Sequence, residues 1–283
     1  MAPIMLKPVA LSHGHYECRS LAETLPVLTD LLALAVVERR DAEAVLKHPN
    51  TDWLLAVHEG GQGSPDKPHM NHYGVRVANR HEVDAAWDYL RRHRERYGLE
   101  KITRPGETHF AYSFYFKEPG GNYWEIEFYD HVAAAHGPSA AAPHWRDLLL
   151  DARFPGRGYI PQAFTHGTLE CDDREASARF YREVLGLEIA GAGRVSVHIK
   201  HASTPWYIVV IPSKRRHYLS PASRFTLAVG SPEAVEEAHR AFATSGGALR
   251  ITELGDVRKD DRGVSFTFSD LDRNWWEIMG RDA

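Results

Sequence analysis

The chain has 283 residues, with 34 Lys and Arg against 38 Asp and Glu, so its formal net charge is −4. This length suits about two domains, and the near-neutral charge argues against a nucleic-acid partner. The two cysteines cannot cross-link a fold of this size, and no stretch approaches the ~20 apolar residues of a membrane span, so we expect a cytoplasmic protein without a membrane partner.

The elements predicted along the chain follow the same order twice. Apolar residues at helical spacing predict helices over residues 21–32, 82–97, 172–184 and 232–245. Runs rich in Val, Ile and aromatics predict strands around them, among them 195–199, 206–211, 225–229, 264–269 and 275–279. Each half of the chain therefore contains two units in which a strand and a helix precede several strands, which makes four units in all.

Two short motifs recur at nearly the same separation, about 150 residues. Ser-His-Gly at 12–14 recurs as Thr-His-Gly at 165–167, and Asn-Tyr-Trp-Glu-Ile at 122–126 recurs as Asn-Trp-Trp-Glu-Ile at 274–278. Two independent matches at one separation make a chance repeat improbable. We therefore predict two related domains, residues 8–130 and 163–283, joined by an Ala- and Pro-rich linker over 131–162.

This order of elements, with these end motifs, resembles the vicinal oxygen chelate superfamily of glyoxalases, bleomycin resistance proteins and dioxygenases. The resemblance covers nearly the whole chain outside the linker and implies an α+β fold, in which four βαβββ units pair into two domains. Members of this superfamily hold a metal with residues on the first strands of successive units and on a last strand. Carried over by position, the resemblance implies His13, His72 and Glu125 as the metal ligands.

Two imidazoles and one carboxylate form the ligand set of non-haem Fe(II) sites, which keep positions open for a substrate and O2. We therefore expect Fe(II) as the cofactor, with Mn(II) as the alternative. In domain 163–283, His166 and Glu277 match two of the ligands, but Arg224 stands opposite His72. Because a guanidinium does not ligate a cation, we expect Arg224 to pair with Glu277 and this domain to lack a complete metal triad.

The stretch from residue 109 to residue 125 indicates which reaction of the superfamily to expect. It resembles the signature of two-domain type I extradiol dioxygenases through Ser113-Phe-Tyr115 and the Glu-Pro-Gly-Gly run at 118–121. By this resemblance, Tyr115 would hydrogen-bond the substrate and His109 would act as an acid/base or positioning group. The resemblance implies an enzyme that opens the ring of a catecholic or related hydroxylated aromatic with O2, and we expect a homo-oligomer. Those enzymes usually carry the metal in the C-terminal domain, whereas the complete set here is N-terminal.

Extradiol dioxygenases often carry a further His on the last strand of the preceding unit. Our alignment places Trp53 at that position, so either another residue, such as His15 or His58, supplies the acid/base group or the reaction differs. His15 shares strand parity with His13 and is a candidate for a substrate contact. The candidate substrate-binding residues are His15, Trp53, Tyr73 and Tyr123.

Two other function classes stay open for this fold, a metal-dependent non-oxygenase (isomerase, lyase or transferase) and a small-molecule-binding protein. Glyoxalase-like members need a fourth ligand, usually Glu, on the strand over 52–57, where Trp53 and the two leucines after it cannot serve. Resistance transferases are usually single-domain chains without the Ser-Phe-Tyr element. A pure binder would not need a complete metal triad.

Overall fold

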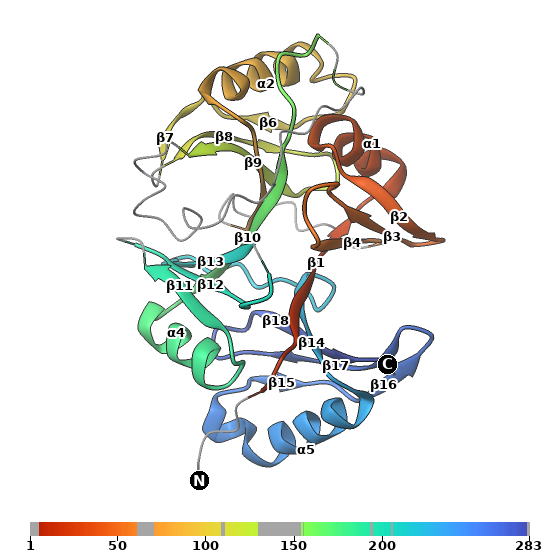
Figure 1. The fold of residues 1–283 in the computed structure, drawn as a ribbon, viewed down its shortest axis with the longest axis vertical. Helices are drawn as coiled ribbons and strands as arrows, with labels where there is room; N and C mark the ends of the chain where they lie inside the picture. The colour runs from red at the N-terminus through yellow and green to blue at the C-terminus, as the bar shows by residue number, and fades with distance from the viewer. Residues whose placement is uncertain are drawn as a thin grey trace. The chain divides into compact units, whose positions relative to one another are not determined.

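The structure is a computed structural model that describes residues 6–60, 71–108, 111–129, 154, 156–192, 195–204 and 206–281 (Figure 1). Its contacts divide the chain into two compact parts. Body 1 comprises Met1–His15, Leu169–Thr204 and Ile208–Ala283, and body 2 comprises Tyr16–Thr168 and Pro205–Tyr207. The division falls inside two strands, β1 (Ala10–Cys18) and β10 (Ala163–Cys171), so it differs from the boundary that the sequence repeat predicts.

The predicted α+β fold of strand–helix–strands units is confirmed, with short additional strands in the second and fourth units. After β1, the first unit contains α1 (Leu21–Leu32), β2 (Ala35–Arg40), β3 (Glu43–Lys47) and β4 (Leu54–Glu59). The second contains β5 (His72–Arg76), α2 (Arg80–Arg92), β6 (Lys101–Ile102), β7 (Gly106–Thr108), β8 (Ala111–Lys117) and β9 (Tyr123–Tyr129). After β10, the third contains α4 (Arg174–Glu183), β11 (Glu188–Ala192), β12 (Val197–Lys200) and β13 (Tyr207–Pro212). The fourth contains β14 (Arg224–Val229), α5 (Pro232–Leu249), β15 (Glu253–Leu254), β16 (Arg258–Asp260), β17 (Gly263–Ser269) and β18 (Trp275–Gly280).

The four predicted helices are present, and their ends follow local capping. The helix α1 spans the predicted residues, whereas α2 begins two residues early because the Asn79 side chain accepts a hydrogen bond from the Glu82 amide. The helix α5 begins at the predicted residue, Pro232, and Ser231 caps it. It continues beyond the predicted end to Leu249, where Arg250 in a left-handed conformation ends it. None of the described helices is long and apolar enough to cross a membrane.

In body 2, one sheet has the order β10-β5-β9-β8-β6, and the end of β1 adjoins β4, β3 and β2 in that order. The strand β5 runs parallel to β9, while β10 is antiparallel to β5. An apolar cluster on one side of these strands contains Trp53, Tyr73, Trp124 and Phe164. The helix α2 packs against β8 and β9 (Figure 1).

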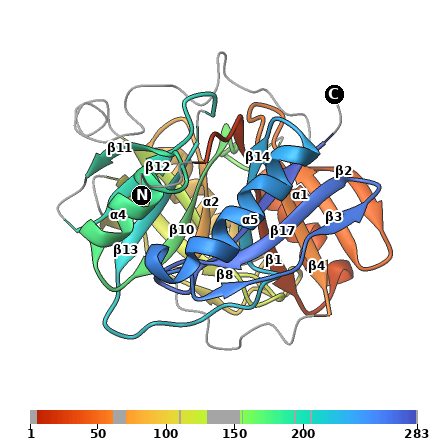
Figure 2. The ribbon, with the colours of Figure 1, turned by 90° about the horizontal axis from the view of Figure 1, so that it is seen from below.

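In body 1, one sheet has the order β15-β17-β18-β14-β1, with β14 parallel to β18 and antiparallel to β1. This arrangement repeats that of β5, β9 and β10 in body 2. The helix α5 covers one face of the sheet, and Figure 2 shows it running across β17. Phe242 of α5 packs edge-on against Phe266 and Phe268 of β17, so the alternate residues of β17 face the other side.

Candidate metal centre

Three side chains of body 2 converge on one point. The Nε2 atom of His72 lies 3.1 Å from Nε2 of His166 and 3.3 Å from Oε2 of Glu125, and His166 Nε2 lies 3.2 Å from the same oxygen. Glu125 is completely buried, and His72 and His166 are 6% and 2% exposed. These three residues are the group within the described ranges whose ligand atoms could hold a metal ion together.

The spacing of these atoms fits a divalent metal. Bonds of about 2.1 Å at right angles place neighbouring ligand atoms about 3 Å apart, which is close to the three distances observed. Two imidazole nitrogens and one carboxylate oxygen on one face leave further positions for other ligands, as in non-haem Fe(II) sites. A buried cluster of two histidines and a carboxylate therefore has both the chemistry and the geometry of a facial metal triad.

The register of three adjacent strands produces this convergence. Gly74 of β5 pairs with Glu125 of β9 on one side and with His166 of β10 on the other. The pairing of β10 with β5 is irregular between Phe164 and His166. Such a bulge interrupts the regular alternation of side chains along β10 just before His166. Gly74 leaves room for the imidazole, because a Cβ atom at that position would lie 2.1 Å from Cε1 of His166.

The expected triad of His13, His72 and Glu125 is corrected by this geometry, because His166 stands with His72 and Glu125. The sequence repeat pairs units that follow one another within each half of the chain. In the fold, the first strand of the third unit joins the sheet of the second unit, and that pairing supplies the third ligand. His166, which the repeat marks as the counterpart of His13, therefore belongs to the complete set.

Buried charge surrounds His166. Burial lowers the pKa of this imidazole, but the carboxylates of Glu127 and Glu125 outweigh it and raise the pKa to about 9. Oε1 of Glu127 lies 3.6 Å from Nδ1 of His166 and accepts a hydrogen bond from Arg76 Nη2 at 2.8 Å. Burial disfavours the charged form of Glu127, but Arg76 and then His166 lower its pKa to about 2.

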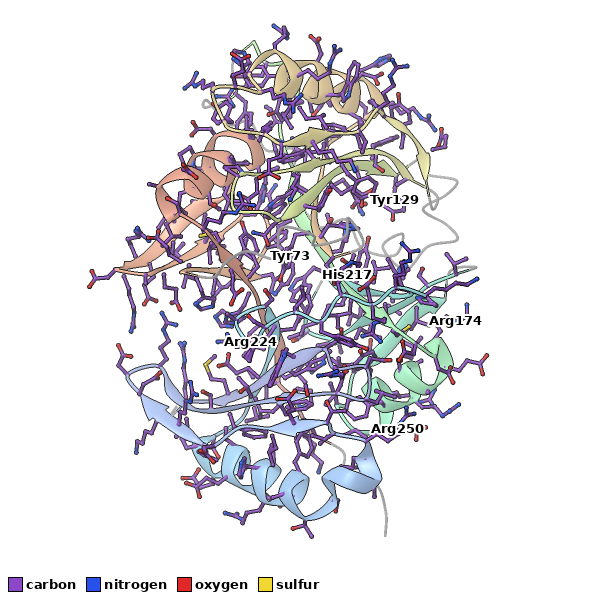
Figure 3. All side chains as sticks on the ribbon, turned by 180° about the vertical axis from the view of Figure 1, so that it is seen from behind. Tyr73, Tyr129, Arg174, His217, Arg224 and Arg250 are labelled. Carbon is purple, nitrogen blue, oxygen red and sulfur yellow. The ribbon has the colours of Figure 1, made fainter. Side chains whose placement is uncertain are left out.

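The corresponding place in body 1 holds an ion pair. His13 pairs in register with Thr226, and Thr226 pairs with Glu277, as His166 pairs with Gly74 and Gly74 with Glu125. Arg224, which is labelled in Figure 3, binds Glu277 at 3.2 Å, and this contact confirms the predicted pair. Thr226 also donates to Glu277 at 2.7 Å. The Arg224 guanidinium and the Thr226 hydroxyl therefore bind the Glu277 carboxylate oxygens that a metal would need as ligands.

The remaining histidines of the predicted site have different surroundings. His15 is 5% exposed and lies in body 1, with Nε2 2.8 Å from the Thr226 hydroxyl and 3.7 Å from Glu277. The substrate contact expected for His15 stays a prediction. His58, named as an alternative acid/base, pairs with Glu43 at 3.0 Å. His109 lies outside the described residues.

Two predicted tyrosines lie on the sheet face of the cluster. Tyr115 pairs directly with Glu125 across β8 and β9, and its ring meets that of His72 edge-on, with the centroids 5.0 Å apart. Tyr123 lies two residues before Glu125 and pairs with His72. Because directly paired residues project from the same face of a sheet, both side chains flank the cluster. Their roles in catalysis and substrate binding stay predictions.

Trp53 and Tyr73 lie in the apolar cluster of body 2, and the substrate-binding role expected for them stays a prediction. Trp53 is completely buried and stacks on Trp206 and Phe164. Tyr73 follows His72 and therefore projects from the opposite face of β5, where it contacts Trp124. The strand that brings an aromatic ring to a ligand is β13, whose Tyr207 stacks on His166 with the centroids 5.6 Å apart.

Comparisons with known proteins place this chain in a family. The profile of the Glyoxalase/Bleomycin resistance protein/Dioxygenase superfamily matches residues 12–126 and again 163–278. These two segments make up most of the chain and coincide with the repeat. The chain therefore belongs to this superfamily, whose members are mostly metalloenzymes.

Several solved structures share this fold over nearly the whole chain. Glyoxalase I from Zea mays has a TM-score of 0.66 and 16% identity, over 97% of this chain and 92% of that chain. A "putative dioxygenase" from Bacillus subtilis subsp. subtilis str. 168 has a TM-score of 0.64 and 14% identity, over 98% and 87%. Comparison with curated proteins gave no match. At these identities the likeness shows the fold alone.

Proposed function

We propose that the protein is a non-haem Fe(II)-dependent extradiol-type dioxygenase, which opens the ring of a catecholic or related hydroxylated aromatic with O2. The observation that carries this proposal is the buried group of His72, His166 and Glu125, whose ligand atoms lie 3.1–3.3 Å from one another. Within the described ranges no fourth His, Cys, Asp or Glu joins this group. Three protein ligands leave room for two substrate oxygens and O2, whereas glyoxalase-like chemistry needs a fourth protein ligand.

The residues around the cluster have defined tasks in this proposal. A bound divalent iron supplies a Lewis-acidic, redox-active centre at which an aromatic diol and O2 can react. The two imidazoles and Glu125 hold that ion. Tyr115, which projects from the same face beside His72, hydrogen-bonds an oxygen of the substrate. The buried strands β5, β9 and β10 exclude water from one side of the reaction.

The test combines metal content with O2 consumption. Protein purified without oxygen is loaded with Fe(II), and O2 uptake is measured against a panel of catechols and hydroquinones. We expect one iron per chain and uptake with at least one diol. His166→Ala is expected to lose the metal, while the matched variant His13→Ala retains it, because His13 stands outside the triad. Stoichiometric iron without O2 uptake on any diol would instead favour the alternative of a metal-dependent non-oxygenase.

A further inference from the structure

A chain of buried polar groups extends behind His166, on the side away from the proposed metal. The Thr165 hydroxyl lies 3.0 Å from Nδ1 of His166 and 2.9 Å from Oε1 of Glu127. The same Glu127 oxygen accepts a hydrogen bond from Arg76 at 2.8 Å. Thr165 and Glu127 are completely buried and Arg76 is 6% exposed, so water does not compete for these bonds. The ring of Tyr129, which is labelled in Figure 3, lies against the Arg76 guanidinium, with Cζ 4.6 Å from the ring centroid.

The direction of these hydrogen bonds follows from the number of protons. An ionised carboxylate accepts and cannot donate, and the Thr165 hydroxyl has a single proton. Two acceptors face the hydroxyl, Oε1 of Glu127 at 2.9 Å and the carbonyl oxygen of Gly74 at 3.1 Å, and the charged, nearer carboxylate is the stronger acceptor. When the hydroxyl donates to either of them, its oxygen accepts from His166, so Nδ1 carries a hydrogen. The lone pair available for a metal is then on Nε2, which is the atom that faces His72 and Glu125.

The duplicated fold contains an internal control for this arrangement. In body 1, Ser12 takes the place of Thr165, and its hydroxyl lies 2.8 Å from Nδ1 of His13. The positions of Arg76 and Glu127 correspond there to Ala228 and Met279, which pair in the same register. The body without a complete triad thus keeps the hydroxyl and lacks the charged pair. The charged pair occurs with the complete ligand set.

We propose that Glu127 is a positioning residue for the metal centre: held by Arg76 and acting through the Thr165 hydroxyl, it fixes the Nδ1–H tautomer and the ring orientation of His166 and so strengthens metal binding. The inference rests on the proposed metal centre. Arg76 is required because a lone buried carboxylate would be costly, and the guanidinium compensates its charge. A ligand imidazole whose other nitrogen donates to an acceptor binds metal more tightly, and loss of such partners typically lowers affinity about 10–100-fold.

The experiment measures metal affinity directly, by competition between the full-length protein and a chelator for Co(II). Thr165→Val keeps the branched shape and removes the hydroxyl, and we expect it to bind Co(II) about 10–100-fold more weakly. Thr165→Ser restores the hydroxyl and is expected to restore the affinity. Ser12→Ala removes the equivalent hydroxyl beside His13 and should leave the affinity unchanged.

A second readout reports the tautomer without a metal. The ¹⁵N NMR shifts of the His166 ring, measured above the pKa of this group, should show Nδ1–H in the wild type and a loss of that preference in Thr165→Val and in Glu127→Gln. A folded Thr165→Val protein with wild-type Co(II) affinity and an unchanged tautomer would overturn this inference and leave the metal centre standing. A wild-type protein that binds no Co(II) would overturn both.

Discussion

Gly74 shapes the candidate metal centre because it has no side chain. Its position between Glu125 and His166 puts the imidazole ring where a Cβ atom would otherwise lie. The equivalent position in body 1 is Thr226, whose hydroxyl binds Glu277. At this strand position, the glycine of body 2 leaves room for the His166 ring, whereas the threonine of body 1 places a side chain against the carboxylate.

Gly74→Ala should displace His166 and weaken metal binding. The added methyl group would lie 2.1 Å from the ring, so the imidazole or the strand must move, and a shift of this size separates the ligand atoms. We expect a loss of affinity of about 100-fold, measured by chelator competition. Gly106→Ala is the matched control, because a Cβ atom there meets nothing within 4 Å. Equal affinity in both variants would contradict the crowding argument.

His13 occupies the strand position in body 1 that His166 occupies in body 2, but Met279 stands there in place of Glu127. The pKa values of the two imidazoles differ accordingly. Burial is the largest cause that lowers its pKa to about 4, and Arg281, Arg262 and Arg224 act in the same direction against Glu277. The neutral form is therefore favoured in the folded protein.

This depressed pKa predicts a loss of stability in acid. Above pH 6.5 the His13 imidazole is neutral in both the folded and the unfolded chain, so its protonation does not reduce the free energy of unfolding. As the pH falls from 6.5 towards 4, the unfolded chain gains a proton at His13 while the folded chain does not, and this difference favours unfolding. The free energy of unfolding should fall by up to roughly 3 kcal/mol from this group. Urea unfolding at pH 7 and pH 4.5 checks this, and His13→Gln should show a smaller fall. A parallel pH dependence in both proteins would refute the assignment.

At the scale of elements, the turns before β9 and β18 are built alike. Glu118 is completely buried and accepts hydrogen bonds from the Gly120 and Asn122 amides, the Asn122 side chain and Thr24. In the second repeat, Asp270 accepts from the amides of Asp272 and Asn274. The Glu-Pro-Gly-Gly run that resembles a catalytic signature is therefore a turn that sets where β9, and with it Glu125, begins.

Glu118→Ala should destabilise body 2, because it leaves four donors without their common acceptor. We expect the free energy of unfolding to fall by about 2–4 kcal/mol, measured by urea denaturation. Glu95→Ala, at an exposed position after α2, is the control and should change stability by less than about 0.5 kcal/mol. A similar stability for the two variants would show that the turn does not depend on the carboxylate.

Features that depend on residues close together in the chain, such as helices and repeated motifs, could be predicted from the sequence. Apolar spacing located the four helices, and the recurrence of His-Gly and Trp-Glu-Ile located the duplication. Strand pairing between units could not be read in this way, since the partner of β10 lies about 90 residues away and both candidate partners have similar patterns. The charged residues Arg76 and Glu127, within otherwise apolar strands, were the available signal that the second unit has a polar site.

At the scale of the whole molecule, the two repeats share one backbone arrangement around a histidine but differ in the residues that surround it. Both carry a strand irregularity immediately before the histidine, between Leu11 and His13 and between Phe164 and His166. One copy surrounds that histidine with His72 and Glu125, and the other surrounds it with Thr226 and an Arg224–Glu277 pair. Within the described residues only one group could hold a metal ion, so the proposed centre predicts one metal per chain.

The passage of β10 into body 2 also constrains how such a gene can be inherited. A fragment that encodes residues 8–130 contains two of the three ligands, and the third is encoded in the other repeat. Neither half would therefore carry the proposed ligand set by itself, although each half matches the family profile. If the metal site is required for function, recombination at the linker would separate His166 from His72 and Glu125.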